Sequence, residues 1–204
     1  MAADLPIPFF AAAREYAELK AEIDAALSTV MASGQALQGP AVAAFEAAVA
    51  ARAGRKHAVA VGSATDAIYF ALLSAGLGPG DEALAPAISF VASASPILRA
   101  GAIPVFCDVL PNGAMDLADA ARKTTDKTRA VVHVDLFGAM SDPGPVEAFA
   151  EERGLALIED AAQAFGASSP HIVLVEVVQR RSPHKAVQLR RDLQSQNHHR
   201  QDHL

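Results

Sequence analysis

The chain carries a small polar turn of the kind that can hold an anion. It runs from Gly62 to Thr65, between an apolar run predicted as a short buried strand (57–61) and a predicted helix. Glycine permits a tight turn, and the N–H groups and dipole at the start of a helix attract negative charge. The hydroxyls of Ser63 and Thr65 add donors, so a phosphate group would be well held here. A serine that only caps its own helix explains the same residues, so both interpretations stay open.

Asp160 ends another apolar run, LALIED, and is followed by Ala-Ala-Gln. Ligands of parallel sheets bind beyond the carboxyl ends of the strands, where a carboxylate can keep a pyridine nitrogen protonated. Capping of the next helix is an equally good interpretation. Phe90 follows a different strand and can stack on a planar ring or belong to the core. His133 and Asp135 lie at a further strand end, where a structural hydrogen bond is the more usual role for histidine.

Alternating strand and helix patterns must position these residues. Residues 14–31 carry apolar side chains at spacings of three and four, typical of an amphipathic helix. Pro40 begins a second helix, which Gly54 closes. Strand-like runs then alternate with helical stretches, at residues 57–61, 82–90, 103–109, 130–134 and 155–160. This alternation predicts an α/β fold, with a mostly parallel sheet covered by helices on both faces.

Composition and charge exclude several classes of protein. The 204 residues are 51% hydrophobic and 20% charged, which is typical of a globular domain. A net charge of −6 argues against a nucleic-acid partner, because such proteins usually present a basic face. The single cysteine, Cys107, excludes an intramolecular disulfide and fits a reducing compartment. Neither a secretory signal nor an apolar run of about 20 residues is present, so we expect a cytoplasmic protein without a membrane partner.

Several segments, taken together and in order, resemble the DegT–StrS family of PLP-dependent nucleotide-sugar aminotransferases. These segments are HAVAVGSATDAI, PAISFVASASPILRAGAIPVFCDV, HVDLFGAMSDP and LALIEDAAQAFGA. The resemblance covers about residues 5–168. It implies the large domain of the fold type I PLP-dependent transferases, a three-layer α/β/α arrangement around a mostly parallel sheet. That large domain is expected to be incomplete here, with the C-terminal small domain missing.

The resemblance implies roles for five residues around pyridoxal 5'-phosphate (PLP). Ser63 and Ala64 match the positions that bind the cofactor phosphate, and Phe90 matches the aromatic that stacks on the pyridine ring. Asp160 matches the carboxylate that pairs with the ring nitrogen, and Gln163 matches the polar residue near the ring hydroxyl. These roles agree with the anion site and the strand-end carboxylate inferred from the residues themselves.

The resemblance also implies a reaction and its partners. Enzymes of this family transfer an amino group, here expected to come from glutamate, through PLP to a nucleotide-linked keto-sugar. The setting implied is polysaccharide or antibiotic-sugar biosynthesis. The expected partners are therefore a nucleotide-diphosphate keto-sugar, an amino-acid donor and a second copy of the chain in a homodimer.

The character of the sequence changes after residue 168. Residues 169–204 contain none of the 13 glycines but five of the seven histidines, with six basic and three acidic residues. The family's Schiff-base lysine is expected near Leu189, and the nearest candidate is Lys185, which is also explained as an ordinary solvated lysine. We therefore expect residues 1–168 to belong to the large domain and 169–204 to form a non-homologous tail, frameshifted or disordered. A truncated and inactive aminotransferase is the resulting expectation.

Three other interpretations stay open. One is a pseudoenzyme fragment that binds PLP or a partner subunit without turnover. Another is a lysine-free sugar dehydratase relative, in which histidine replaces the lysine; His184 and His198 are candidates, but neither has the surrounding motif. The last is a metal site in the tail. Adjacent residues His198 and His199 point apart on a strand and no Cys or carboxylate cluster completes a ligand shell, so we expect no metal ligand.

Overall fold

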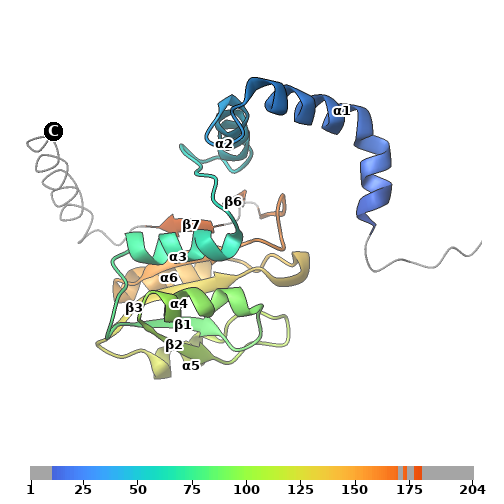
Figure 1. Ribbon diagram of the computed structural model, residues 1–204. Coiled ribbons are helices and arrows are strands. Elements are labelled where there is room, and N and C mark those ends of the chain that lie inside the picture. The colour runs from blue at the N-terminus through green and yellow to red at the C-terminus, as the bar shows by residue number, and fades with distance from the viewer. Residues whose placement is uncertain (1–10, 170–171, 174–176, 181–204) are drawn as a thin grey trace, which may run out of the picture. The chain divides into compact units, whose positions relative to one another are not determined.

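The computed structural model describes residues 11–169, 172–173 and 177–180 (Figure 1). The chain divides into two units, Met1–Ala48 and Val49–Leu204. The first unit holds α1 and the beginning of α2. The sheet and the remaining helices lie in the second unit.

Two helices open the chain, as the apolar spacing predicted. Helix α1 (Ala12–Ser33) ends where Gly34 adopts a left-handed φ of 67°, a conformation that glycine takes without steric cost. None of its residues is buried. Helix α2 (Pro40–Arg52) begins at the predicted proline, whose fixed φ suits a first helical position.

The second unit is built on four parallel strands in the order β2-β1-β3-β4. They are β1 (Glu82–Pro86), β2 (Ile103–Cys107), β3 (Thr128–Val134) and β4 (Ala156–Asp160). A fifth strand, β7 (Val177–Arg180), lies antiparallel beside β4, and β5 (Ser168–Ser169) pairs with β6 (Ile172–Val173). The predicted α/β class with a mostly parallel sheet is confirmed.

Helices cover both faces of this sheet (Figure 1). They are α3 (Ala64–Ser74), α4 (Ser95–Arg99), α5 (Leu117–Lys123) and α6 (Gly144–Arg153), with short 3-10 helices η1 (Val91–Ser93) and η2 (Leu136–Gly138). Alternate residues of one strand serve opposite faces. Ala83 and Ala85 of β1 pack with α3 and α4, whereas Leu84 packs with α5 and α6. The three-layer arrangement follows from this alternation.

The segment 57–61 was predicted as a buried strand, and that prediction is wrong. It belongs to no strand of the described sheet, and both Val59 and Val61 are exposed. An apolar run becomes a strand only when another strand lies alongside to receive its N–H and C=O groups. The local pattern does not say whether such a neighbour exists. Helix α3 nevertheless begins at the predicted turn.

The expected tail lies mostly outside the described residues. Of residues 169–204, the structure describes 169, 172–173 and 177–180, all in the short strands β5, β6 and β7. The boundary after residue 168 and a frameshifted origin of the tail stay predictions. Among the residues described, no helix combines the length and apolar character that crossing a membrane requires.

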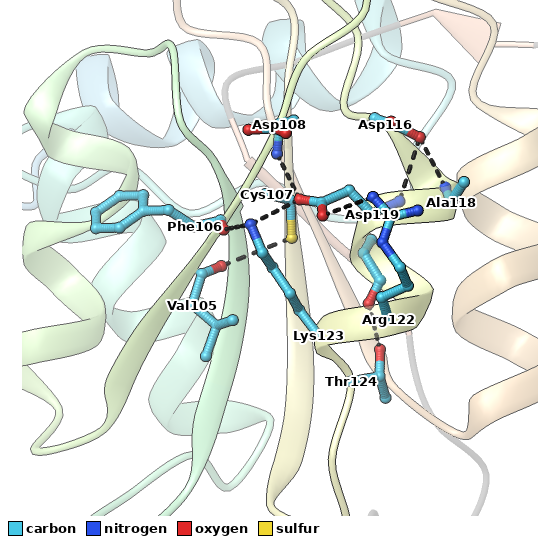
Figure 2. A network of polar contacts seen from close by, with 11 residues as sticks. Val105, Phe106, Cys107, Asp108, Asp116, Ala118, Asp119, Arg122, Lys123 and Thr124 are labelled. Carbon is cyan, nitrogen blue, oxygen red and sulfur yellow. Dashed lines mark hydrogen bonds and ion pairs between the residues drawn. The ribbon is translucent and has the colours of Figure 1, made fainter.

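A cluster of charged side chains joins β2 to α5 (Figure 2). The carboxylate of Asp119, which is buried, accepts a hydrogen bond from the Asp108 backbone N–H at 2.8 Å. It also forms ion pairs with Lys123 at 2.7 Å and Arg122 at 2.9 Å. Lys123 in turn donates to the carbonyl of Phe106 at 2.8 Å. The Lys123 ammonium is the main cause that lowers the pKa of Asp119 to about 2.

Cys107 lies next to this cluster but is not a reactive thiol. Its side chain is fully buried, and its sulfur lies 3.7 Å from the Val105 carbonyl. Burial, reinforced by the charge of Asp119, raises the pKa of the thiol to about 11. Because only the thiolate is a good nucleophile, Cys107 acts as a small core residue.

Candidate cofactor site

A cavity of about 150 Å³ lies at the carboxyl edge of the sheet. Its lining residues come from the start of α3, the segment after β1 and the ends of β3 and β4: Ala64, Thr65, Ser89, Phe90, Ala92, Val134, Asp135, Leu136, Asp160, Ala162 and Gln163. Four of the five predicted cofactor residues are among them. The exception is Ser63, which directly precedes the lining residue Ala64. Residues up to 99 positions apart in the chain are therefore brought to one site.

Ser63 caps helix α3. Its Oγ accepts a hydrogen bond from the Asp66 backbone N–H at 3.2 Å and lies 3.2 Å from the Asp66 carboxylate, to which it donates. That carboxylate is paired with Arg99 at 2.7 Å, so its negative charge is compensated beside the turn. The N–H groups of Ala64 and Thr65 belong to the first turn, where a helix offers no internal acceptor. The capping interpretation thus holds for the Ser63 side chain, while the backbone N–H groups remain suited to an anion.

Asp160 is a buried residue of the cavity lining, with 6% of its surface exposed. Its Oδ2 accepts a hydrogen bond from Ser93 Oγ at 3.0 Å, and its Oδ1 accepts from the Ala162 N–H at 3.3 Å. Burial raises the pKa of this carboxyl, with a further contribution from the charge of Asp135, while the two hydrogen bonds act in the opposite direction. The interpretation of Asp160 as a helix cap is wrong, because residues 161–167 form turns and no helix follows β4 in this stretch.

Gln163 and Phe90 line the same cavity as this carboxylate. Gln163 Oε1 accepts a hydrogen bond from the Phe137 backbone N–H at 3.0 Å, which leaves its amide NH₂ as a donor for a ligand. Phe137 makes this bond with a left-handed φ of 58°. Phe90 is 63% exposed and therefore available for stacking instead of belonging to the core.

The two polar residues predicted at the end of β3, His133 and Asp135, differ in their relation to the cavity. Asp135 lines the cavity, whereas His133 is buried and does not. His133 Nε2 lies 3.0 Å from Ser141 Oγ and 3.6 Å from Asp135 Oδ1. A nucleophilic Ser–His–Asp triad requires the serine and the carboxylate on different ring nitrogens. Here both approach the same nitrogen, so this cluster is structural.

The structure also brings in Ser89 and Ser93, which sequence reasoning missed. Ser89 lines the cavity and its Oγ lies 2.7 Å from Ser93 Oγ. Both lie in the stretch SFVAS, where Ser89 directly precedes Phe90 and Ser93 follows it by three residues, so their hydroxyls are visible in the sequence. Nothing in that stretch indicates a bond to a residue 67 positions later.

No lysine of the described residues lines the cavity. Four lysines fall in the described part of the chain: Lys20, Lys56, Lys123 and Lys127. The candidate Lys185 lies outside the described residues, as do His184, His198 and His199. Within the described ranges no group of three or more His, Cys, Asp or Glu side chains is placed to hold a metal ion.

Comparison with known proteins places this geometry in a family. The sequence model of the DegT/DnrJ/EryC1/StrS aminotransferase family matches residues 17–171. The chain belongs to this family. The match confirms the resemblance, which was inferred over about residues 5–168, from residue 17 onward. This DegT/DnrJ/EryC1/StrS chain is thus a relative of sugar aminotransferases.

Characterised relatives of this DegT/DnrJ/EryC1/StrS chain are much longer. It is 43% identical over 162 residues to a pleiotropic regulatory protein of Geobacillus stearothermophilus, covering 79% of this chain and 44% of the relative. It is 40% identical over 164 residues to the dTDP-3-amino-3,4,6-trideoxy-alpha-D-glucose transaminase of Streptomyces venezuelae, covering 79% and 43%. The chain therefore spans less than half the length of these relatives.

Solved structures agree. DesV of S. venezuelae, in complex with a ketimine intermediate, superposes with a TM-score of 0.76 at 38% identity, covering 78% of this chain and 43% of that one. NtdA of Bacillus subtilis, with the bound cofactor PMP, superposes with a TM-score of 0.74 at 31% identity, covering 79% and 38%. The fold of this family member is thus that of PLP-dependent aminotransferases.

Proposed function

We propose that the cavity is the cofactor-binding part of a PLP-dependent aminotransferase that acts on a nucleotide-linked keto-sugar. The observation that carries the proposal is the meeting of Ala64, Phe90, Asp160 and Gln163 around one cavity. Each of the four matches a cofactor-binding position of the family that the sequence resembles. The family membership and the sugar aminotransferases among the relatives support the substrate class.

The residues present fit PLP on three chemical counts. The cofactor carries a phosphate dianion, and the first turn of α3 offers backbone donors with the Asp66 charge neutralised by Arg99. It carries a planar ring, and Phe90 is exposed beside the cavity. Its ring nitrogen needs an anionic partner when protonated, and Asp160 lines the same cavity. When bound, PLP supplies the electron sink that amino transfer requires.

Asp160 and Gln163 would bind the cofactor ring and orient it. Asp160 would hold a proton on the ring nitrogen, and its burial strengthens that charge pairing because few water molecules compete. Gln163 would donate its NH₂ group to the ring hydroxyl, since its carbonyl oxygen is already held by Phe137. The implied co-substrates are a nucleotide-diphosphate keto-sugar and an amino acid such as glutamate, and the implied assembly is a homodimer.

We further propose that the chain binds PLP without turning over. Amino transfer in this chemistry needs a lysine amine at the cofactor, both to bond to it and to move a proton. None of the lysines in the described ranges lines the cavity. The alternative is that Lys185 supplies this amine from outside those ranges.

A visible spectrum of the purified chain with PLP, before and after borohydride, tests both parts. Reversible binding that borohydride does not make covalent, and that Asp160→Asn abolishes, is the expected result. A band that borohydride fixes to the protein, and that is lost in Lys185→Ala, would show that Lys185 completes the site. Glutamate-dependent amination of a nucleotide keto-sugar would contradict the proposed lack of turnover. No binding by a folded chain would overturn the cofactor assignment.

A further inference from the structure

Two serines that the cofactor roles leave unused are connected to Asp160. Ser93 Oγ donates to Asp160 Oδ2 at 3.0 Å, and Ser89 Oγ lies 2.7 Å from Ser93 Oγ. Ser93 is 1% exposed, so water does not compete for its hydroxyl. Ser89 lines the cavity. The three side chains therefore form a continuous path from the cavity wall to the carboxylate.

The direction of this hydrogen-bonded chain follows from counting protons. An ionised carboxylate only accepts, so the single proton of the Ser93 hydroxyl is used on Asp160. Ser93 must then accept from Ser89. The other carboxylate oxygen, Oδ1, is held by the Ala162 N–H at 3.3 Å. Both oxygens of Asp160 are thus fixed by donors that favour its ionised form.

The charge of Asp135 disfavours the ionised form of Asp160. Asp135 lines the same cavity, its side chain is buried, and its Oδ2 has no hydrogen-bond partner among the described residues. Ionisable groups also lie on the other elements packed around β4. They are His133 on β3, Asp135 directly after it, Glu159 on β4 itself, Asp66 on α3, Arg99 on α4, Glu147, Glu151, Glu152 and Arg153 on α6, and Arg180 on β7, which is paired with Leu157 and not with Asp160. Of these, Asp135 is the one whose charge opposes ionisation of Asp160.

We propose that Ser93 is a positioning residue for Asp160. Its hydroxyl, itself oriented by Ser89, fixes the carboxylate and supports the charged form that a protonated ring nitrogen needs as a partner. This inference rests on the proposed function for its purpose. The hydrogen bond itself depends on no ligand, so it can be tested separately.

The direct test is a carboxyl-carbon NMR titration of the ligand-free full chain, with the Asp160 resonance identified by its loss in Asp160→Asn. Ser93→Ala is expected to move the titration midpoint of Asp160 to higher pH, because a donor to the ionised form is lost. Asp135→Asn is expected to move it to lower pH, because an opposing charge is lost. Ser89→Ala, which leaves the bond from Ser93, is expected to cause a smaller upward shift than Ser93→Ala.

Ser74→Ala is the matched control. It removes an exposed hydroxyl of α3 that does not line the cavity, so the Asp160 midpoint should stay at its parent value. Circular dichroism establishes that each variant is folded. A Ser93→Ala chain that folds like the parent and shows an unchanged Asp160 midpoint overturns the proposal.

PLP titration followed by absorbance is the second readout. Ser93→Ala is expected to weaken PLP binding about tenfold, the effect of losing one hydrogen bond to a charged group. The pH below which PLP binding is lost should also be higher for Ser93→Ala than for the parent. If the parent binds no PLP but the NMR midpoints shift as stated, the cofactor assignment fails and the positioning role stands. If the parent binds PLP and Ser93→Ala alters neither affinity nor midpoint, the positioning role fails by itself.

Discussion

Two aspartates show how strongly the surroundings of one residue decide its chemistry. Burial raises the pKa of Asp160, where the nearby charge of Asp135 adds to the cost of ionisation. The ammonium of Lys123 and the N–H of Asp108 lower the pKa of Asp119 to about 2, although its side chain is also buried. The cationic partners of Asp119 make it a structural anchor. Among the described residues Asp160 has no such cationic partner, which suits a site for a cationic ligand group.

Asp160→Asn should stabilise the ligand-free chain while abolishing PLP binding. A carboxyl whose pKa is raised by folding holds its proton more tightly in the folded state, so its ionisation lowers the free energy of unfolding as pH rises. The stability advantage of the asparagine variant over the parent should therefore grow from acidic to neutral pH. Urea unfolding at several pH values measures this difference. A parent that is more stable than the variant at neutral pH would contradict it.

Asp119→Asn should change the response to acid in the opposite sense. The Asp119 pKa falls from 3.8 to about 2 on folding, so its contribution to stability is complete above 3.8 and is lost as pH falls toward 2. The variant should be less stable than the parent at neutral pH, with the difference narrowing in this acidic range. Thermal melts at several pH values, from neutral into this acidic range, measure the difference in stability between the variant and the parent. Asp126→Asn, at an exposed position outside the cluster, is the control and should follow the parent curve.

At the scale of elements, the ends of helices are decided by single residues. Ser63 caps α3, and Asp116 caps α5 by accepting from the Ala118 N–H at 2.8 Å. Gly154 ends α6 with a left-handed φ of 65°. These local contacts fix where α3 starts and α6 stops, and thereby where the turn and β4 that build the cavity begin.

Gly154→Ala should cost about 1 kcal/mol of unfolding free energy, because a Cβ disfavours the left-handed conformation. An added Cβ there meets no atom within 4 Å, so the cost is conformational and not a clash. Gly78→Ala is the matched control: an added Cβ also finds open space, and its φ is not positive. That variant should keep or slightly exceed the parent stability. Equal losses in the two variants, measured by urea unfolding, would contradict this explanation.

For the whole chain, stability is expected to concentrate in the sheet. The central strands β1 and β3 hold residues with no exposed surface, such as Leu84 and Val131. No residue of α1 is buried, and a helix in water without packing is marginally stable. We therefore expect the backbone hydrogen bonds of the sheet to be protected by core packing and those of α1 to lack this protection.

Amide hydrogen exchange should show this difference directly. We expect the amides of β1 and β3 to exchange only through extensive unfolding, and those of α1 to exchange orders of magnitude faster because local opening costs little. Mass spectrometry of exchanged peptides resolves the two regions. Protection of α1 equal to that of β3 would show that α1 packs against a surface, and would overturn the expectation.

Prediction from sequence succeeded where the signal is local. The helices α1 and α2, the strands β1 to β4 and the turn before α3 follow from periodicity, proline and glycine placement, and apolar runs. It missed α5, although Asp116 followed by Leu-Ala-Asp-Ala-Ala-Arg-Lys has both a cap and good helix formers. It failed at residues 57–61 because a strand depends on a neighbour that no local pattern specifies.

The candidate site shows the same division between features that are local in sequence and contacts between distant segments. The sequence by itself determined the family, the α/β class and the chemical types of Ala64, Phe90, Asp160 and Gln163. Only the tertiary structure decided that these residues line one cavity and that Ser93 reaches Asp160 across 67 positions. It also decided that Asp135 lies in the same cavity, with an oxygen that no described residue pairs. The physical reason is that such contacts depend on which strands lie side by side. Strand order is set by the packing of the whole sheet, and no short stretch of sequence encodes it.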